Sequence, residues 1–294
     1  MSIAGQTLYV VATPLGNLGD ITHRAVAVLA AADVIAAEDT RHSRRLLQHY
    51  GITTPCVALH EHNEAREAAR LVARLRKGAA VALISDAGTP LLSDPGYVLV
   101  RRVQAAGFRV VPVPGPSALT AALSAAGLPT ERFAFEGFLP ARAAARRRRL
   151  QALCEETRTL VFYEAPHRIL ALLQDLVALL GATREAALAR ELTKTFETIH
   201  RAPLSDLLAW VTEDPNRQRG EFVVLVHGAT PPGDASRETE VTVDRKRLLA
   251  VLLAHMPART AVAVAAELTG RRRNLLYEEA MALREGEGAG DDGP

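Results

Sequence analysis

The stretch AAVALISDAGTPLLSDPGY, residues 79–97, contains the pattern on which the predicted fold depends. An apolar run over 79–84 ends abruptly in the tetrapeptide SDAG, residues 85–88, and a near-copy, SDPG, follows at 93–96. Serine, aspartate, glycine and proline are the usual turn formers, so an ordinary surface turn is one interpretation. A ligand-binding loop is the other, because glycine lets a ligand approach main-chain amides and Asp86 can accept hydrogen bonds.

Short apolar strands alternate with amphipathic helices from residue 7 to about 114. Alternation of this kind, with nearly all-apolar strands, predicts a parallel β-sheet that helices cover on both faces. The expected strands are 7–12, 34–38, 56–59, 79–84 and 109–114, and the expected helices are 20–32, 41–50, 62–77 and 96–106.

Each of these strands leads into a polar or glycine-rich loop. Because ligands bind beyond the carboxyl ends of the strands in such sheets, the loops predict a functional cleft at that edge. Within the opening stretch we expect residues 86–88 to form the ligand cradle, and Ser93 or Asp94 to cap the next helix with Pro95 in its first turn. The five loops are 13–17, 38–42, 60–63, 85–97 and 115–118.

A proline-rich connector, PVPGPSA at 112–118, is the best candidate for a domain boundary. Beyond it, two strands near 193–196 follow each other without a helix, which implies a mixed sheet. The expected elements are helix 116–126, strand 133–138, helix 141–156, strand 159–165, helix 166–180, strands 185–193 and 196–202, helix 204–212, strand 220–228, and helices 244–256, 259–268 and 271–284. The predicted fold class is therefore α/β, with two α/β domains in series, 1–114 and 115–230, a polar linker, 231–243, a small C-terminal helix-turn-helix-like module, 244–285, and a disordered tail, 286–294.

Composition excludes several classes of protein. With 294 residues, 48% of them hydrophobic, the chain is neither disordered nor fibrous. No apolar run reaches the roughly 18 residues of a membrane helix, and the first residues lack the layout of a secretory signal, so we expect a cytoplasmic protein with no membrane association. Two distant cysteines suit reduced thiols, and the pair of histidines in HEH, 60–62, supplies at most two ligands, so we expect no metal.

The formal net charge of +2 conceals local clusters of arginine at 142–149 and 271–273. Such runs are either solvated helix faces or contacts for a phosphate backbone, and composition alone does not decide between them. The chain contains neither the G-x-G-x-x-G pattern of dinucleotide-binding proteins nor a G-x-x-x-x-G-K-[ST] loop for nucleoside triphosphates.

A set of long motifs resembles the RsmI family of ribosomal RNA small-subunit methyltransferases, which belongs to the tetrapyrrole-methylase-like (class III) methyltransferases. The motifs are VATPLGNLGDIT, AEDTRHS, LISDAGTPLLSDPGY, PVPGPSA, GLP followed by FEGFLP, FYEAPHRI, RELTKTFETI and GEFVVLV, in this order over residues 6–285. The resemblance implies S-adenosylmethionine in a cleft between two α/β domains, a homodimer and no metal. It also implies 2′-O-ribose methylation of a cytidine in the decoding centre of 16S ribosomal RNA within the small ribosomal subunit.

Three segments match the family's cofactor site: the loop 86–90, the hinge 114–118 and the strand end 162–165. The cofactor-binding residues that we assign with this resemblance are Leu15, Asp86, Ala87, Gly88, Thr89, Pro90, Pro114, Gly115, Ser117, Ala118, Phe162, Tyr163 and Glu164.

A ribose hydroxyl is a poor nucleophile near neutral pH and profits from a general base or a neighbouring charge. We expect the catalytic groups among Lys194, Glu191, Asp39 and His60, with Glu164 and His167 as further candidates. Lys194 either favours an alkoxide by its charge or acts as a base if burial lowers its pKa. The charges of RELTKTFE, 190–197, form ordinary surface ion pairs in the alternative interpretation.

We expect RNA contacts from four regions: a helix start after the capping residue Thr40, a flexible basic flap after residues 137–140, the helix start at 166–168, and the C-terminal helical module. The residues are Arg41, His42, Arg44, Arg146, Arg147, Arg148, Arg149, His167, Arg168, Arg271, Arg272 and Arg273. Two other functions remain open: a methylase of tetrapyrrole-type small molecules, and a nucleic-acid-binding regulator with a ligand-sensing α/β body.

Overall fold

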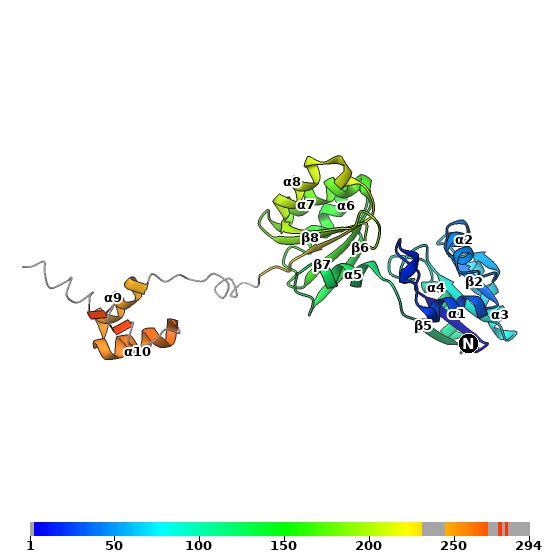
Figure 1. Ribbon diagram of the computed structural model, residues 1–294, viewed down its shortest axis with the longest axis horizontal. Coiled ribbons are helices and arrows are strands. Elements are labelled where there is room, and N and C mark those ends of the chain that lie inside the picture. Colours follow the sequence, from blue (N-terminus) through cyan, green and yellow to red (C-terminus); the bar gives the residue numbers. More distant parts are fainter. Residues whose placement is uncertain (1–2, 231–244, 270–275, 278–279, 282–294) are drawn as a thin grey trace, which may run out of the picture. The chain divides into compact units, whose positions relative to one another are not determined.

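The computed structural model describes residues 3–230, 245–269, 276–277 and 280–281 (Figure 1). The chain divides into two compact units, 1–229 and 230–294. The predicted linker, 231–243, and the predicted tail, 286–294, lie outside the described residues. In the described part of the chain, no helix is both long and apolar enough to cross a membrane.

The first sheet is parallel throughout, as the alternating pattern predicts. Its strands are β1 (Thr7–Val11), β2 (Val34–Ala37), β3 (Cys56–Ala58), β4 (Ala80–Ile84) and β5 (Arg109–Val113), in the order β3-β2-β4-β1-β5. Pro112 lies on the edge strand β5, where a missing N–H costs no ladder hydrogen bond. The inner strands β2 and β4 are buried at every residue, because helices cover both faces.

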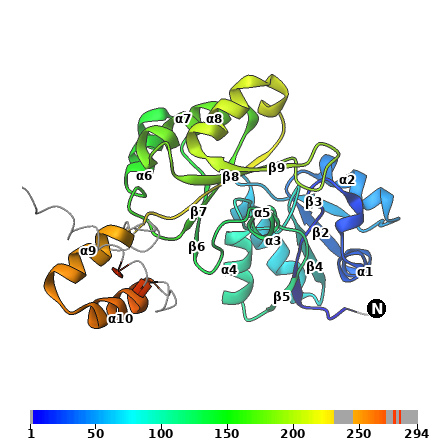
Figure 2. The same cartoon turned by 60° about the vertical axis from the view of Figure 1, so that its left-hand side comes forward.

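Helices cover both faces of this sheet (Figure 2). The helices α1 (His23–Ala31) and α2 (Thr40–His49) pack on one face, and α3 (Glu64–Arg76) and α4 (Tyr97–Ala105) pack on the other. Their buried side chains, such as Leu29 and Leu99, belong to two separate core clusters on the two faces. The prediction of a doubly covered parallel sheet is therefore confirmed.

Two helix starts differ from the sequence-based expectation. Asp39, and not Thr40, caps α2, since its Oδ1 accepts a hydrogen bond from the Arg41 backbone N–H at 2.7 Å. Neither Ser93 nor Asp94 caps α4, which begins at Tyr97 with Gly96 as its N-cap. Glu64 from the start of α3 supplies the acceptor instead. Its Oε1 accepts from the backbone N–H groups of Gly96, Val98 and Leu99 at 3.0, 2.8 and 3.2 Å.

The second sheet is mixed, as predicted. It contains β6 (Phe133–Phe138), β7 (Thr159–Glu164), β8 (Glu185–Arg190), β9 (Thr198–Pro203) and β10 (Phe222–Val226), in the order β6-β7-β10-β8-β9. Only β6 and β7 pair in parallel, and the other neighbours are antiparallel. The helices α6 (Ala143–Gln151), α7 (Ile169–Leu180) and α8 (Leu204–Glu213) lie together on one face, and α5 (Ala118–Ala125) lies on the other (Figures 1 and 2). The short 3-10 helices are η1 (Leu18–Asp20), η2 (Pro166–Arg168) and η3 (Pro215–Gln218).

The second unit is helical where it is described. Helices α9 (Arg245–His255) and α10 (Ala258–Thr269) share a small apolar cluster with Leu276 and Ala280. These last two residues belong to the third predicted helix, 271–284, most of which lies outside the described residues.

Candidate active site

A cavity of about 400 Å³ lies in the first unit, where loops beyond the first sheet meet strand ends of the second. This volume is in the range of small-molecule sites. The lining residues come from the loops after β1, β2, β4 and β5, from the ends of β6 and β7, and from the segments around β8 and β10. They are Leu15, Glu38, Asp86, Ala87, Gly88, Thr89, Leu92, Ser93, Asp94, Ser117, Ala118, Phe138, Tyr163, Glu164, Ala165, Pro166, Leu192, Glu221, Phe222 and Val223.

Most of the residues that we assigned to a cofactor line this cavity, and their contact with a cofactor stays a prediction. Four assigned residues lie outside the lining: Pro90, Pro114, Gly115 and Phe162. The assignment of Phe162 is wrong because its fully buried ring packs into the core on the opposite face of β7 from Tyr163. Adjacent residues of a strand point to opposite faces, so only one of the two reaches the cavity.

The loop after β4 forms one wall of the cavity with its main chain. Gly88 pairs with Thr13 through two backbone hydrogen bonds of 2.9 and 2.8 Å, which tie the loops after β4 and β1 together. The φ of Gly88 is +80°, and a Cβ atom there would lie 3.1 Å from a methyl group of Leu15. The positive φ and this close contact together require glycine at position 88. In the same loop, Oδ1 of Asp86 accepts a hydrogen bond from the Asp39 backbone N–H at 3.1 Å, which joins the loop after β4 to the loop after β2.

Three carboxylates, Glu38, Asp86 and Asp94, belong to the wall that the first sheet supplies. Burial raises the pKa of Asp94 to about 6, against a hydrogen bond from Ser85 that lowers it, and the charges of Glu38 and Asp86 raise it further. Burial, followed by the charge of Asp86, also raises the pKa of Glu38. Because these carboxylates repel one another in a partly desolvated site, a bound cation would be stabilised there.

Glu164 is a buried carboxylate at the end of β7. Its Oε1 accepts from the Ala165 backbone N–H at 2.9 Å and lies 3.1 Å from Nε of Arg168, whereas Oε2 is buried with no hydrogen-bond partner among the described residues. Burial raises the pKa of Glu164. Arg168 donates to the Leu139 carbonyl at 2.6 Å, and 18% of its side chain is exposed. Its contact with RNA stays a prediction.

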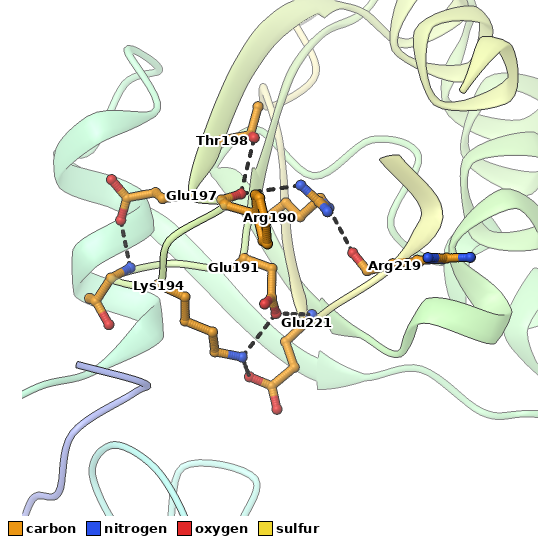
Figure 3. Close-up of polar contacts among 9 residues, drawn as sticks. Arg190, Glu191, Lys194, Glu197, Thr198, Arg219 and Glu221 are labelled. Atoms are coloured by element: carbon orange, nitrogen blue, oxygen red, sulfur yellow. Dashed lines mark hydrogen bonds and ion pairs between the residues drawn. The ribbon is translucent and has the colours of Figure 1, made fainter. Parts of the chain in front are cut away.

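A second charged cluster, drawn in Figure 3, includes the cavity-lining residue Glu221. Nζ of Lys194 lies 2.9 Å from Oε1 of Glu191 and 2.9 Å from Oε2 of Glu221, which lines the cavity. Burial lowers the pKa of Lys194, but the hydrogen bonds to the two carboxylates outweigh burial and raise the pKa above its ordinary value. Of the two predicted roles of Lys194, the geometry therefore favours the permanent cation over the base.

The loop that carries Lys194 is strained. Glu191 and Thr193 have φ values of +52° and +66°, a region that costs non-glycine residues about 1 to 3 kcal/mol and occurs often at functional sites. Arg190 donates to the carbonyls of Arg219 and Phe196 instead of pairing with an acid (Figure 3). The segment 190–197 is thus more than a set of surface ion pairs.

Asp39 and His60 are less well placed for catalysis. Asp39 is the cap of α2, and the Arg41 backbone N–H holds its pKa below the ordinary value, which makes it a weaker base. His60 follows β3, the outer strand of the first sheet, and neither residue lines the cavity. In the described part of the chain, His, Cys, Asp and Glu do not gather in groups of three or more that could hold a metal.

The basic run 146–149 forms part of helix α6. The prediction that the whole run contacts RNA is wrong for Arg146, whose side chain is buried and donates to Asp175 at 2.7 Å. Arg147 donates to the same carboxylate at 2.7 Å, and Arg149 pairs with Glu136 at 2.8 Å.

Several predicted RNA contacts remain on the surface. They are Arg41, His42, Arg44, Arg147, Arg148, Arg149 and His167, which are exposed. Arg271, Arg272 and Arg273 lie outside the described residues.

Sequence reasoning did not assign several residues of the cavity lining, among them Glu38, Asp94, Phe138 and Glu221. Glu38 directly follows a buried strand and was within reach of the strand-end rule, as was Asp94 in the opening stretch. Glu221 enters from the start of the antiparallel strand β10, where that rule does not apply. Phe138 reaches the cavity through an irregularity of β6 that the strand pattern does not reveal.

The chain is similar to known proteins of one structural class. The family model described as Tetrapyrrole (Corrin/Porphyrin) Methylases matches residues 7–208. A uroporphyrin-III-C-methyltransferase from Thermus thermophilus covers 76% of the chain, and 94% of that structure is matched, with a TM-score of 0.55 and 23% identity. A cobalt precorrin-4 methyltransferase matches over 76% of the chain and 95% of its own, with a TM-score of 0.56 and 16% identity. These likenesses define the tetrapyrrole methylase fold.

Relatives at higher identity define the family within this class. A protein of Pseudomonas aeruginosa named "Ribosomal RNA small subunit methyltransferase I" is 60% identical over 94% of this chain and 96% of its own length. A protein of the same name from Escherichia coli O157:H7 is 55% identical over 93% and 94%. Residues 239–284 match the family model of the RsmI C-terminal HTH domain. The chain belongs to the ribosomal RNA small subunit methyltransferase I family, the RsmI family, whose methyl donor is S-adenosylmethionine.

Proposed function

We propose that this protein transfers a methyl group from S-adenosylmethionine to the ribose 2′-hydroxyl of a cytidine in 16S ribosomal RNA. The observation that carries the proposal is the family membership over nearly the whole chain, together with a cavity whose acidic wall suits a cationic donor. The assembled small subunit is the proposed substrate, and the protein acts as a homodimer in the cytoplasm.

The residues of the cavity fit the proposed donor. S-adenosylmethionine supplies an electrophilic methyl group on a positively charged sulfur atom. The carboxylates of Glu38, Asp86 and Asp94 would attract that positive charge, and the partly apolar lining with Leu15 and Ala118 would hold the uncharged parts. Gly88 has no side chain of its own, so a ligand can closely approach its main-chain groups.

The residues of the protein align the methyl donor with the acceptor oxygen and stabilise the charge that develops on that oxygen. Methyl transfer is an in-line displacement, so an enzyme gains much of its rate by holding the acceptor oxygen about 3 Å from the methyl carbon and excluding water. Lys194 is a permanent cation beside the cavity and would favour the developing alkoxide. The buried carboxylate of Glu164 carries a free oxygen and a raised pKa, which are properties of a general base.

The RNA surface that we propose consists of exposed cations. Arg41, His42 and Arg44 lie in the first turns of α2, where the helix start adds favourable potential for a phosphate. Arg147, Arg148, Arg149 and His167 are exposed in the part of the unit that carries the second sheet. We retain Arg271 to Arg273 as candidates in the C-terminal module.

A labelling experiment tests the proposal against its alternatives. The full-length protein is incubated with S-adenosylmethionine that carries a radiolabelled methyl group and with small ribosomal subunits from a methylation-deficient strain. Label in the RNA is expected. Label only in an added tetrapyrrole would indicate a small-molecule methylase, and cofactor binding without turnover on either substrate would indicate a regulator.

A further inference from the structure

An exposed aromatic ring stands at the cavity. Phe138 is the last residue of β6, and 54% of its surface is open to solvent although it lines the cavity. An apolar ring in this position is costly to hydrate and contributes little to the core, so its placement requires an explanation.

A β-bulge directs Phe138 into the cavity. Phe135 lies opposite Val161 of β7, but the next pair is Gly137 with Phe162, so Glu136 is an extra residue. Side chains of a strand alternate between its faces, so without the extra residue Phe138 would point to the other side of the sheet. With it, Phe138 pairs with Tyr163 and shares the cavity face.

The bulge is built around a glycine. Gly137 has a φ of +61°, and a Cβ atom there would lie 2.7 Å from Oγ of Ser93, in the loop after β4. Neither this backbone conformation nor this close contact suits a larger residue. The local structure therefore fixes the direction of Phe138 at the expense of the regular strand.

The neighbouring rings hold Phe138 in place. Its ring centroid lies 5.7 Å from that of Tyr163 in an edge-on arrangement, and Tyr163 lies 4.9 Å from Phe135 in the same manner. The hydroxyl of Tyr163 accepts a hydrogen bond from the Leu119 backbone N–H at 3.1 Å. Phe138 is thus an oriented ring with more than half of its surface free.

The two walls of the cavity differ in chemistry. The wall of the first sheet carries Glu38, Asp86 and Asp94, which suit a cation, whereas Phe138 and Tyr163 on the second sheet offer aromatic surface. A ribose hydroxyl reaches an enclosed site only if its nucleotide leaves the RNA stack, and proteins recognise such bases by stacking them on aromatic side chains. We propose that Phe138 is the stacking platform for the base of the nucleotide whose ribose is methylated. This inference rests on the proposed function.

Three variants of the full-length protein test the proposal. Phe138→Ala removes the ring, Phe138→Leu keeps an apolar side chain without a π-face, and Phe138→Trp keeps an aromatic face. Since the position is exposed, none of them disturbs the core. We expect the alanine and leucine variants to lose roughly 5- to 150-fold in kcat/KM on small subunits, with S-adenosylmethionine binding in calorimetry unchanged. The tryptophan variant is expected to retain activity.

A spectroscopic measurement adds a readout of the stacking itself. Trp210 is the chain's one tryptophan, so Phe138→Trp combined with Trp210→Phe places a single reporter at the cavity. Its fluorescence is expected to be quenched when small subunits are added. Absence of quenching in an active variant would overturn the proposal.

Other outcomes separate this inference from its alternatives. Full activity of Phe138→Leu would overturn it, as would an equal loss of S-adenosylmethionine affinity, which would place the ring against the cofactor. A changed sedimentation coefficient would assign Phe138 to an interface between copies of the chain. If the unaltered protein methylates no RNA in the same assay, the proposed function fails, whereas failure of the variants alone to differ refutes only the stacking role.

Discussion

The side chain of Lys194 lies directly against the backbone of Gly16, so closely that a Cβ atom on Gly16 would overlap its Cγ and Cε atoms. Gly16 follows β1 of the first sheet and Lys194 follows β8 of the second, so the contact joins loops of both sheets. The same lysine bridges Glu191 and Glu221 at 2.9 Å each. A cation is therefore fixed from three sides next to the cavity.

Replacing Lys194 by alanine is expected to lower turnover and leave cofactor binding intact. Loss of one preorganised electrostatic contact typically reduces kcat by about 10²- to 10³-fold. The measurement is single-turnover methylation together with calorimetric binding of S-adenosylmethionine. Lys77→Ala, at an exposed site at the end of α3, is the matched control and should behave like the unaltered protein. An unchanged rate in Lys194→Ala would remove this residue from the mechanism.

Gly88→Ala is expected to weaken S-adenosylmethionine binding. Gly107 has almost the same φ, +79° against +80°, but a Cβ atom there meets nothing within 4 Å, whereas at Gly88 it meets Leu15 in the cavity wall. Both alanine variants should lose about 1 kcal/mol of folding free energy through backbone strain. Only Gly88→Ala should lose cofactor affinity. Equal affinities in calorimetry would refute the assignment of the loop after β4 as a cradle.

Asp94→Asn is expected to raise stability near neutral pH and to weaken cofactor binding. The pKa of Asp94 is raised from 3.8 to about 6, so the folded state binds the proton more tightly than the unfolded state and stability falls as pH rises through this window. After a discount for solvent screening, the asparagine variant should gain roughly 1 kcal/mol above that window and nothing below it.

The ionisation of Asp94 should also change the affinity of the protein for S-adenosylmethionine. Because the ionised carboxylate attracts the cationic donor, we expect S-adenosylmethionine affinity of the unaltered protein to decline as pH falls through about 6. The decline should be smaller in Asp94→Asn. Denaturant unfolding and calorimetry across this pH range measure both effects, and identical pH profiles for the two proteins would contradict the role of Asp94.

Arg146→Ala and Arg148→Ala should separate stability from RNA binding. Removing Arg146 leaves the buried carboxylate of Asp175 with only Arg147, and loss of one partner of a buried ion pair costs about 3 kcal/mol. Arg148 is exposed, so its removal should leave stability unchanged and reduce the slope of RNA affinity against salt by about one. Equal stability of the two variants would contradict the burial of Arg146.

The sequence predicted the elements and their order because strand and helix periodicities are local properties. The expected strand 79–84 and helix 96–106 match β4 and α4 within a residue or two. The cap of α4 was missed because Glu64 lies more than thirty positions away in the chain. Arg146 was misassigned for a related reason, since its partner Asp175 belongs to another helix.

The residues of the candidate site also divide into those that the sequence predicted and those whose position depends on contacts with distant parts of the chain. Asp86 was assigned because its position after a parallel strand depends on the strand pattern, whereas Tyr163, within β7, was assigned through the family resemblance. Phe162 was misassigned because the choice of face at the end of β7 depends on pairing with its neighbours. Phe138 and Glu221 were missed because a bulge and an antiparallel strand bring them to the cavity.

The central claim, methylation of a ribose hydroxyl, is tested most directly by locating the transferred methyl group. Small subunits labelled by the full-length protein are stripped to RNA and hydrolysed with alkali, which cleaves next to a free 2′-hydroxyl and leaves the bond beside a methylated one intact. The account predicts label in an alkali-resistant dinucleotide that begins with cytidine. Label released in a mononucleotide would show methylation of a base and would contradict the account.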